Sequence, residues 1–214
     1  MGYRVLPSTP LQPAHLAQAD LSRLASGIAA FLLALHRIPV NEALAMDLPG
    51  PAARMADLEA LRADVLPPLR ATVTGQDYDV VRRWWDRFLS DKTMRRYTPV
   101  LQHGDFWYEN MLVDKAPASR ALVGVIDVEH AAVGDPAQDF ATQLHLGVDG
   151  ADRVIDAYHH LGGTFDVTFR HRMQRLWELR AFDGLGFAVR HADSTEFEDV
   201  VRKLRGGPIL TQGR

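Results

Sequence analysis

The stretch that decides the fold is Leu101-Gln102-His103-Gly104-Asp105-Phe106-Trp107-Tyr108-Glu109-Asn110-Met111-Leu112-Val113. Two short apolar runs, one around Val100 and one at the end of the stretch, flank a polar loop that carries His103, Asp105 and Asn110. Short apolar runs that are bounded by turn residues predict strands. We therefore expect two strands joined by a loop of the kind that carries catalytic side chains.

A second stretch, Gly124-Val125-Ile126-Asp127-Val128-Glu129, complements the first. The apolar run that leads into it predicts a third strand, which ends on Asp127. The polar residues 114–120 predict the turn of a hairpin between the second and third strands. This arrangement would bring Asp127 to the same end of a small sheet as Asp105 and Asn110.

Three oxygen-bearing side chains at one place indicate a hard cation and a hydroxyl group to be activated. Mg²⁺ takes one or two protein oxygens and completes its octahedron with water and substrate phosphates. A carboxylate nearby can orient an attacking hydroxyl and accept its proton. The spacing His-x-Asp-x4-Asn, followed by an Asp that ends a strand, is typical of a kinase catalytic loop and its metal-binding Asp. A loop of capping residues with a hydrogen-bonded His explains each residue alone, but not the whole set.

These motifs resemble those of the aminoglycoside phosphotransferase family, part of the kinase-like group that includes the choline and macrolide kinases. The resemblance rests on His103-Gly104-Asp105 through Asn110, on Ile126-Asp127, and on Gly134-Asp135-Pro136-Ala137-Gln138-Asp139-Phe140-Ala141. It is strong between residues 98 and 145 and looser elsewhere. The sequence departs from the pattern at Tyr108-Glu109, where many relatives carry Pro-Gly or His-Gly; this concerns the shape of the loop rather than its chemistry.

The resemblance implies a role for each residue of the first two motifs. Asp105 would be the catalytic base, with His103 supporting the loop. Asn110 and Asp127 would bind Mg²⁺, and ATP or GTP would be the phosphate donor. Tyr3-Arg4-Val5-Leu6-Pro7 resembles the hinge between the two lobes of these kinases, where backbone groups such as those of Tyr3 and Val5 meet the adenine.

The third motif would brace the catalytic loop through Asp135 and Asp139. Asp135 also has a purely structural explanation, because Pro136 suits the first turn of a helix and Asp135 would be its N-cap. That helix is expected to continue to about Leu146, with Gly147 as its stop.

Elsewhere the pattern is mostly helical, which predicts an α+β, mainly helical fold with a small catalytic β-hairpin. Residues 1–13 are an extended, hinge-like segment, and residues 14–205 form a kinase-like C-terminal lobe with its catalytic loop at 101–113 and its metal-binding segment at 124–141. Apolar residues from Leu21 to Leu35 recur at helical spacing, and this helix should end near His36, which we interpret as a C-terminal cation facing the helix dipole. The remaining helices are expected at 56–70, 77–91, 150–161, 166–191 and 195–204. The tail, residues 206–214, is expected to be flexible.

Several acidic residues are candidates for binding an acceptor. Glu129 follows the predicted metal-binding Asp127 and could approach the metal or an acceptor amine, or be a solvated acid on a loop. By resemblance, acids on C-terminal helices bind polycationic sugars, but capping and the helix dipole explain acids at a helix N-terminus equally simply. These C-terminal candidates are Asp183, Asp193, Glu196 and Glu198.

Composition excludes several classes of protein. The chain has 214 residues, 47% of them hydrophobic, which is enough for a buried core. It has no cysteine, which excludes disulfides and thiol chemistry, and its net charge of −3 without a basic stripe argues against nucleic acid as a partner. No apolar run approaches the length of a membrane span and no signal peptide is recognisable, so we expect a cytoplasmic protein without membrane contact.

A kinase also needs a glycine-rich loop over the phosphates and a lysine on a strand. The sequence before His103 offers neither. No Gly-x-Gly-x-x-Gly occurs, and the first lysine, Lys92, stands only just ahead of the catalytic loop. We therefore expect this chain to be the catalytic C-terminal lobe without the N-terminal lobe, and the surface left by that lobe could promote self-association.

The leading hypothesis is a Mg²⁺-dependent small-molecule kinase that transfers the γ-phosphate of a nucleotide to a hydroxyl of an aminoglycoside-like substrate. The alternative is an inactive module, derived from such a lobe, that binds a small molecule or a partner. Metal-dependent hydrolysis by the same carboxylates fits the residues but not the spacing for handling phosphates.

Overall fold

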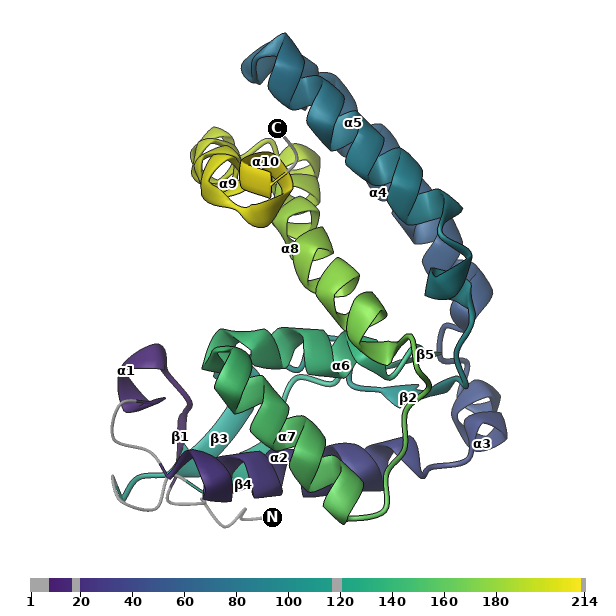
Figure 1. Cartoon of the computed structure of the whole chain (residues 1–214), viewed down its shortest axis with the longest axis vertical. Coiled ribbons are helices and arrows are strands. Elements are labelled where there is room, and N and C mark those ends of the chain that lie inside the picture. Colours follow the sequence, from purple (N-terminus) through teal and green to yellow (C-terminus); the bar gives the residue numbers. More distant parts are fainter. Residues whose placement is uncertain (1–7, 17–19, 117–120, 213–214) are drawn as a thin grey trace, which may run out of the picture. The chain divides into compact units, whose positions relative to one another are not determined.

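The computed structural model describes residues 8–16, 20–116 and 121–212, and the chain divides into two compact units (Figure 1). The first unit comprises the chain up to Gly50 together with residues 98–169. The second comprises residues 51–97 and 170–214. The α+β, mainly helical class predicted from the sequence is confirmed.

Two small antiparallel sheets lie in the first unit. One has the order β1 (Ser8–Pro10), β3 (Met111–Asp114) and β4 (Leu122–Val125), and β3 and β4 are the hairpin that the sequence predicted. The other pairs β2 (Val100–Gln102) with β5 (Ala132–Gly134). The single small sheet that we expected is therefore wrong in one respect: β2 pairs with a strand too short for its pattern to be recognised, rather than with the hairpin.

Helices surround these sheets. α2 (Leu21–His36) follows its N-cap Asp20, whose carboxylate accepts hydrogen bonds from the amides of Ser22 and Arg23, and it ends at the predicted place, three residues before Pro39. Its apolar face packs on α7 (Val148–His160), and Figure 1 shows the two helices side by side. The short elements of this unit are α1 (Pro13–Leu16), α3 (Val40–Ala45), the 3₁₀ turns η2 (Tyr108–Asn110) and η3 (Thr142–Leu146), and α6 (Ala137–Ala141).

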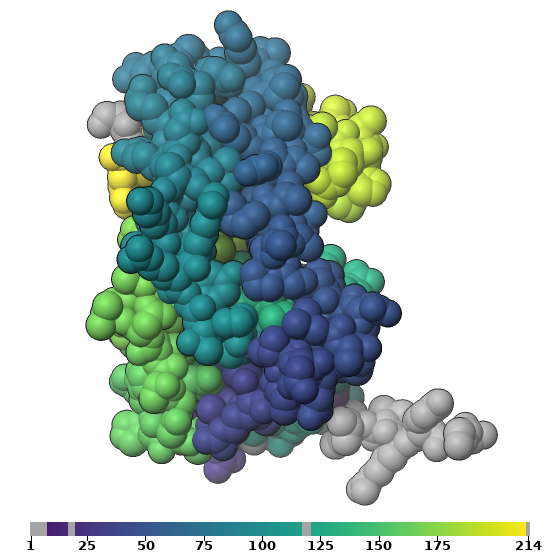
Figure 2. Space-filling model, turned by 90° about the vertical axis from the view of Figure 1, so that its right-hand side faces the viewer, coloured from purple at the N-terminus to yellow at the C-terminus, as the bar shows by residue number. Residues whose placement is uncertain are grey.

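The second unit is helical. α4 (Pro51–Thr72) and α5 (Gly75–Ser90) run side by side and form one continuous surface in Figure 2. On α5, the rings of Trp84 and Trp85 are both buried. The other elements are η1 (Lys92–Arg95), α9 (Ser194–Gly206), α10 (Pro208–Gln212) and α8 (Phe169–His191), which starts at the last residue of the first unit.

The C-terminal residues differ from the flexible tail that we expected over 206–214. Residues 208–212 form α10, in which Ile209 is 5% exposed and Leu210 is fully buried. Pro208 favours a helix here because its fixed φ suits the first helical position. The apolar pair thus anchors a segment whose Gly-Gly-Pro start had indicated only the end of a helix.

No described helix, in residues 8–16, 20–116 or 121–212, combines the length and apolar character that crossing a membrane requires.

Asp91 links three elements of the second unit. It follows the last residue of α5 and caps η1, where its Oδ1 accepts hydrogen bonds from the amide and the hydroxyl of Thr93 at 2.8 and 2.7 Å. Its Oδ2 lies 2.6 Å from Nε2 of His171, on α8. Burial opposes ionisation of the Asp91 carboxyl, but the hydrogen bonds from Thr93 and His171 outweigh it and hold the pKa of Asp91 below its usual value.

This depressed pKa predicts an acid-dependent loss of stability. The ionised Asp91 carboxylate stabilises the fold above its unfolded pKa of 3.8, and the contribution is lost as pH falls through the lower folded pKa. The melting temperature of the wild-type chain should therefore fall more between pH 5 and pH 2.5 than that of Asp91→Asn. Thermal unfolding followed by circular dichroism measures this. Asp79→Asn, which changes a largely exposed acid on the same helix, is the control and should behave like wild type; equal losses in all three proteins would contradict the prediction.

Candidate active site

The catalytic loop begins where β2 ends, with a turn that requires glycine. Gly104 has φ +85°, a left-handed conformation that residues with a side chain rarely adopt. A Cβ atom at this position would lie 2.0 Å from the carbonyl oxygen of His130. The close approach of these two backbones sets the path of the chain into Asp105.

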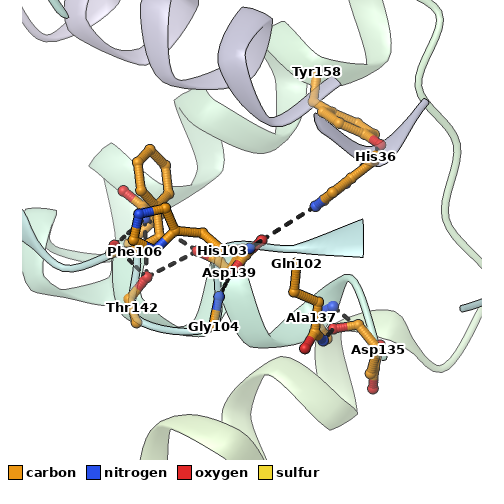
Figure 3. A network of polar contacts seen from close by, with 11 residues as sticks. His36, Gln102, His103, Gly104, Phe106, Asp135, Ala137, Asp139, Thr142 and Tyr158 are labelled. Carbon is orange, nitrogen blue, oxygen red and sulfur yellow. Dashed lines mark hydrogen bonds and ion pairs between the residues drawn. The ribbon is translucent and has the colours of Figure 1, made fainter. Parts of the chain in front are cut away.

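Asp139 of α6 binds the two backbone amides at the start of the loop. Its fully buried carboxylate accepts hydrogen bonds from the N–H groups of His103 and Gly104, each at 3.0 Å (Figure 3). A carboxylate removed from water must find donors within the protein, and bonds to a charged acceptor are stronger than those between neutral groups. Asp139 thereby fixes the backbone immediately before Asp105.

Phe106 is fixed on the other side of Asp105. Its carbonyl oxygen accepts hydrogen bonds from Oγ1 of Thr142 at 2.7 Å and from Nε2 of Gln143 at 3.0 Å. Its ring is fully buried and packs on the ring of Phe31 in α2, with 5.1 Å between centroids. Asp105, which is partly buried, therefore lies between two anchored residues.

Asn110 contacts Asp105 through its side chain. Its Nδ2 donates to the backbone carbonyl of Asp105 at 2.9 Å and to the carboxylate Oδ2 at 3.2 Å. Both contacts need a donor, which identifies the amide nitrogen and leaves the amide oxygen as a ligand for a cation. One side chain thus orients the Asp105 carboxylate and offers an oxygen of its own.

Asp127 is brought to this pair by the residue before it. The N–H of Ile126 donates to the carbonyl of Asn110 at 3.0 Å, and the carbonyl of Ile126 accepts from Nε2 of His103 at 3.1 Å. Asp127 has φ +64°, a left-handed conformation that Asp tolerates better than most residues, and it is exposed. The structure therefore places Asp105, Asn110 and Asp127 at one end of the hairpin.

The oxygen atoms of Asn110 and Asp127 suit Mg²⁺, which takes few protein ligands and prefers oxygen. Within the described residues no group of three or more His, Asp or Glu side chains could hold a metal ion. A cation held by Asn110 and Asp127 would therefore need further ligands, such as water and phosphate oxygens.

Asp135 supports the site through both its side chain and its backbone. Its Oδ1 accepts a hydrogen bond from the N–H of Ala137 at 3.0 Å, which is the capping role that its position predicted. Its carbonyl oxygen accepts a hydrogen bond from Nε2 of Gln102, the residue that ends β2. α6 is thus attached to the start of the catalytic loop through both Asp135 and Asp139.

The other candidate residues belong to segments outside the loop of Asp105 and Asn110. Glu129 is on the exposed segment after Asp127, where its carboxylate lies 3.6 Å from the His130 ring. Asp193 caps α9 by accepting a hydrogen bond from the amide of Glu196 at 3.0 Å, as the capping interpretation predicted. The C-terminal candidates Asp183, Asp193, Glu196 and Glu198 all belong to the second unit. Tyr3 and Val5, the predicted hinge residues, lie outside the described residues.

His36 belongs to the site's supporting network, which our interpretation of it as a helix-end cation missed. Its side chain is 2% exposed, and its ring nitrogens lie 3.4 Å from Asp139 Oδ2 and 3.1 Å from the hydroxyl of Tyr158. The signal was present in the sequence, since His36 is four residues after Leu32 and eight after Ile28 and so continues the buried face of α2.

Comparisons with known proteins identify relatives of this chain. A family model described as "Phosphotransferase enzyme family" matches residues 2–176. The viomycin phosphotransferase of Streptomyces vinaceus is 28% identical over 108 residues, which cover 50% of this chain and 37% of that protein. An aminoglycoside 3'-phosphotransferase of Escherichia coli is 31% identical over 119 residues, which cover 53% of this chain and 40% of that protein. The chain thus spans about two fifths of the length of these curated relatives.

Solved structures show the same fold. A GDP and kanamycin complex of the phosphotransferase APH(2")-IIIa superposes with a TM-score of 0.81 at 21% identity, covering 95% of this chain and 69% of that one. The fold is that of the kinase-like phosphotransferases. Together with the family match, it shows that the chain belongs to the aminoglycoside phosphotransferase family.

The turn at Gly104 predicts that a single methyl group will disturb the first unit. Gly104→Ala adds a Cβ that both strains a left-handed backbone and collides with the His130 carbonyl, whereas Gly162→Ala adds the same group at φ +90° with its nearest neighbour at 3.6 Å. Gly162→Ala should lower the free energy of unfolding by about 1–2 kcal/mol, and Gly104→Ala should lower it clearly more. Urea unfolding of both variants tests this, and equal effects would show that the approach of His130 is not restrictive.

Proposed function

We propose that this chain carries the catalytic residues of a Mg²⁺-dependent small-molecule kinase, which transfers the γ-phosphate of ATP or GTP to a hydroxyl group of an aminoglycoside-like acceptor. The observation that carries this proposal is the fixed carboxylate of Asp105, oriented by Asn110 and held between anchored neighbours. The relatives named for aminoglycoside and viomycin substrates support an acceptor of this class.

Asp105 is proposed as the catalytic base. Its carboxylate would accept a hydrogen bond from the acceptor hydroxyl, orient that oxygen toward the phosphorus, and take up its proton as the new bond forms. Such a base is effective only when its oxygen atoms are held in place, because a misplaced group loses the advantage of proximity. Asn110 supplies this restraint through its bonds to the Asp105 carbonyl and carboxylate.

Asn110 and Asp127 would hold the Mg²⁺ ion. When bound, the ion supplies positive charge that neutralises the phosphate oxygens of the nucleotide. Asp127 contributes the one negative charge of this pair, on a backbone that is pinned at both polar groups of Ile126. Asn110 contributes a neutral oxygen, so its side chain can lie against the Asp105 carboxylate without repulsion.

We also propose which residues contact the nucleotide and the acceptor. Tyr3 and Val5 are proposed to meet the nucleotide base, and Glu129, Asp183, Asp193, Glu196 and Glu198 to be candidates for the cationic groups of the acceptor. A relative crystallised with GDP and kanamycin supports a purine nucleotide and an amino sugar as the ligands to test first. Binding of both ligands without turnover would favour the alternative, an inactive binding module.

Asp105→Asn should abolish most phosphoryl transfer while leaving the fold intact. The amide oxygen of the new side chain can still accept the bond from Asn110, but the group cannot take a proton. The rate should fall by about 10²–10⁴-fold, the usual range for a positioned base. Transfer of radiolabelled phosphate from ATP or GTP to kanamycin measures this. A variant with wild-type turnover would exclude Asp105 as the base.

Asp127→Asn should weaken the metal dependence of nucleotide binding. Asparagine adopts the left-handed conformation at this position nearly as readily as aspartate, so the change removes the charge with little backbone strain. The Mg²⁺ concentration needed for half-maximal nucleotide binding should rise by about tenfold or more. Glu109→Gln removes the same charge from an exposed position in the loop and is the control. If both variants titrate alike, Asp127 is not a metal ligand.

A further inference from the structure

A buried chain of polar groups runs from Tyr158 on α7 to the catalytic loop. The hydroxyl of Tyr158 lies 3.1 Å from Nδ1 of His36, and Nε2 of His36 lies 3.4 Å from Oδ2 of Asp139. The Asp139 carboxylate in turn accepts the amides of His103 and Gly104 (Figure 3). The proposed function uses the polar groups at the catalytic loop and assigns no role to Tyr158 at the other end of the series.

The direction of each hydrogen bond follows from the chemistry of the partners. A carboxylate only accepts hydrogen bonds, so the proton of His36 must be on Nε2, facing Asp139. In a neutral imidazole, Nδ1 then carries a lone pair and needs a donor. The hydroxyl of Tyr158 is that donor, and burial raises the pKa of this hydroxyl, which keeps its proton in place.

Without Tyr158 the orientation of His36 would be lost. The side chain of His36 is 2% exposed and that of Asp139 is fully buried, so bulk water does not replace a missing partner. The Asp139 carboxylate would still keep the proton on Nε2, so the Nδ1 lone pair would be buried without a donor. The ring could then turn or shift toward another donor, which would disturb the contact between Nε2 and Oδ2 of Asp139 at 3.4 Å.

The Tyr158 ring is itself confined to one position. It stacks on Phe165 with 4.8 Å between centroids and meets the edge of Phe140 at 5.2 Å. The backbone of Gly163 also lies against the ring. A Cβ added there would be 2.0 Å from the ring, so only glycine allows the backbone to pass. Such confinement holds the hydroxyl at His36 more tightly than one hydrogen bond would.

We infer that Tyr158 is a positioning residue for the catalytic loop, which acts by holding the His36 ring where Nε2–H faces Asp139 and, through it, the carboxylate of Asp139. The kinetic part of this inference rests on the proposed function, but the His36 ring and the loop amides can be observed in the chain without turnover. Tyr158→Phe is the matched change, because it removes the hydroxyl and keeps the ring in its aromatic surroundings.

The experiment compares wild type with Tyr158→Phe by NMR. The ¹⁵N shift of His36 Nδ1 reports the hydrogen bond from Tyr158, and hydrogen exchange of the Gly104 amide reports the bond to Asp139. In the variant the Nδ1 shift should move to that of a nitrogen without a donor, and the Gly104 amide should exchange roughly three- to tenfold faster, the range expected for loss of one buried hydrogen bond. Tyr78→Phe, on α5 in the second unit, is the control for removal of a tyrosine hydroxyl and should change neither signal.

A second pair of variants separates positioning from packing. His36→Gln offers an amide donor to Asp139 and removes the ring nitrogen that Tyr158 contacts, so adding Tyr158→Phe to it should not accelerate Gly104 exchange further. In assays of phosphate transfer, Tyr158→Phe should lower kcat with little change in the KM of either substrate.

An unchanged His36 Nδ1 shift and Gly104 exchange in Tyr158→Phe would overturn the inference, as would additive effects in the double variant. If the wild-type protein transfers no phosphate, the proposed function fails, and the NMR measurements still decide the role of Tyr158.

Discussion

The buried carboxylate of Asp139 is the constraint on which the site depends. A charge without water must be surrounded by donors, and the donors here are two backbone amides of the catalytic loop and one ring nitrogen of His36. The need to satisfy this charge therefore determines where the loop runs. Asp105 is the next residue after these amides. The position of the proposed base therefore depends on the hydrogen bonds of Asp139, which has no proposed part in the chemistry.

Other side chains also bind backbone groups in and near the loop. The carbonyl of Phe106 is held by two side chains of η3, and the carbonyl of Ile126 by the ring of His103. Each contact joins a side chain to a backbone group, which restrains the chain itself rather than one rotamer. The exposed residues of the site, such as Asp127, are thereby attached to a buried, hydrogen-bonded frame.

The polar centre of the site could be predicted from the sequence because its residues stand at fixed distances along the chain. Asp105 and Asn110 share one loop, and Asp127 lies two residues after the end of β4, which pairs with the strand that follows Asn110, so the hairpin alone brings them together. The kinase-like spacing then supplied their proposed chemistry. Asp135 could be predicted as a cap for the equally local reason that a helix begins beside it.

Features that depend on distant partners could not be predicted. β5 is three residues long and becomes a strand only because β2 pairs with it. His36 was interpreted from its position at a helix end, whereas its role comes from Asp139 and Tyr158, more than a hundred residues away in sequence. The burial of Leu210 likewise depends on the packing of α10 and not on the glycines that precede it.

The division of the chain has a consequence for how the protein is made. Each unit is assembled from two separate segments, so neither is complete when its first segment leaves the ribosome. The apolar face of α2 finds its main partner only when α7 has been synthesised, after the whole of α4 and α5. Contacts between residues so far apart in sequence form slowly and leave apolar surface exposed meanwhile. The nascent chain should therefore depend on chaperones during synthesis, and its yield should be more sensitive to growth temperature than the stability of the finished fold.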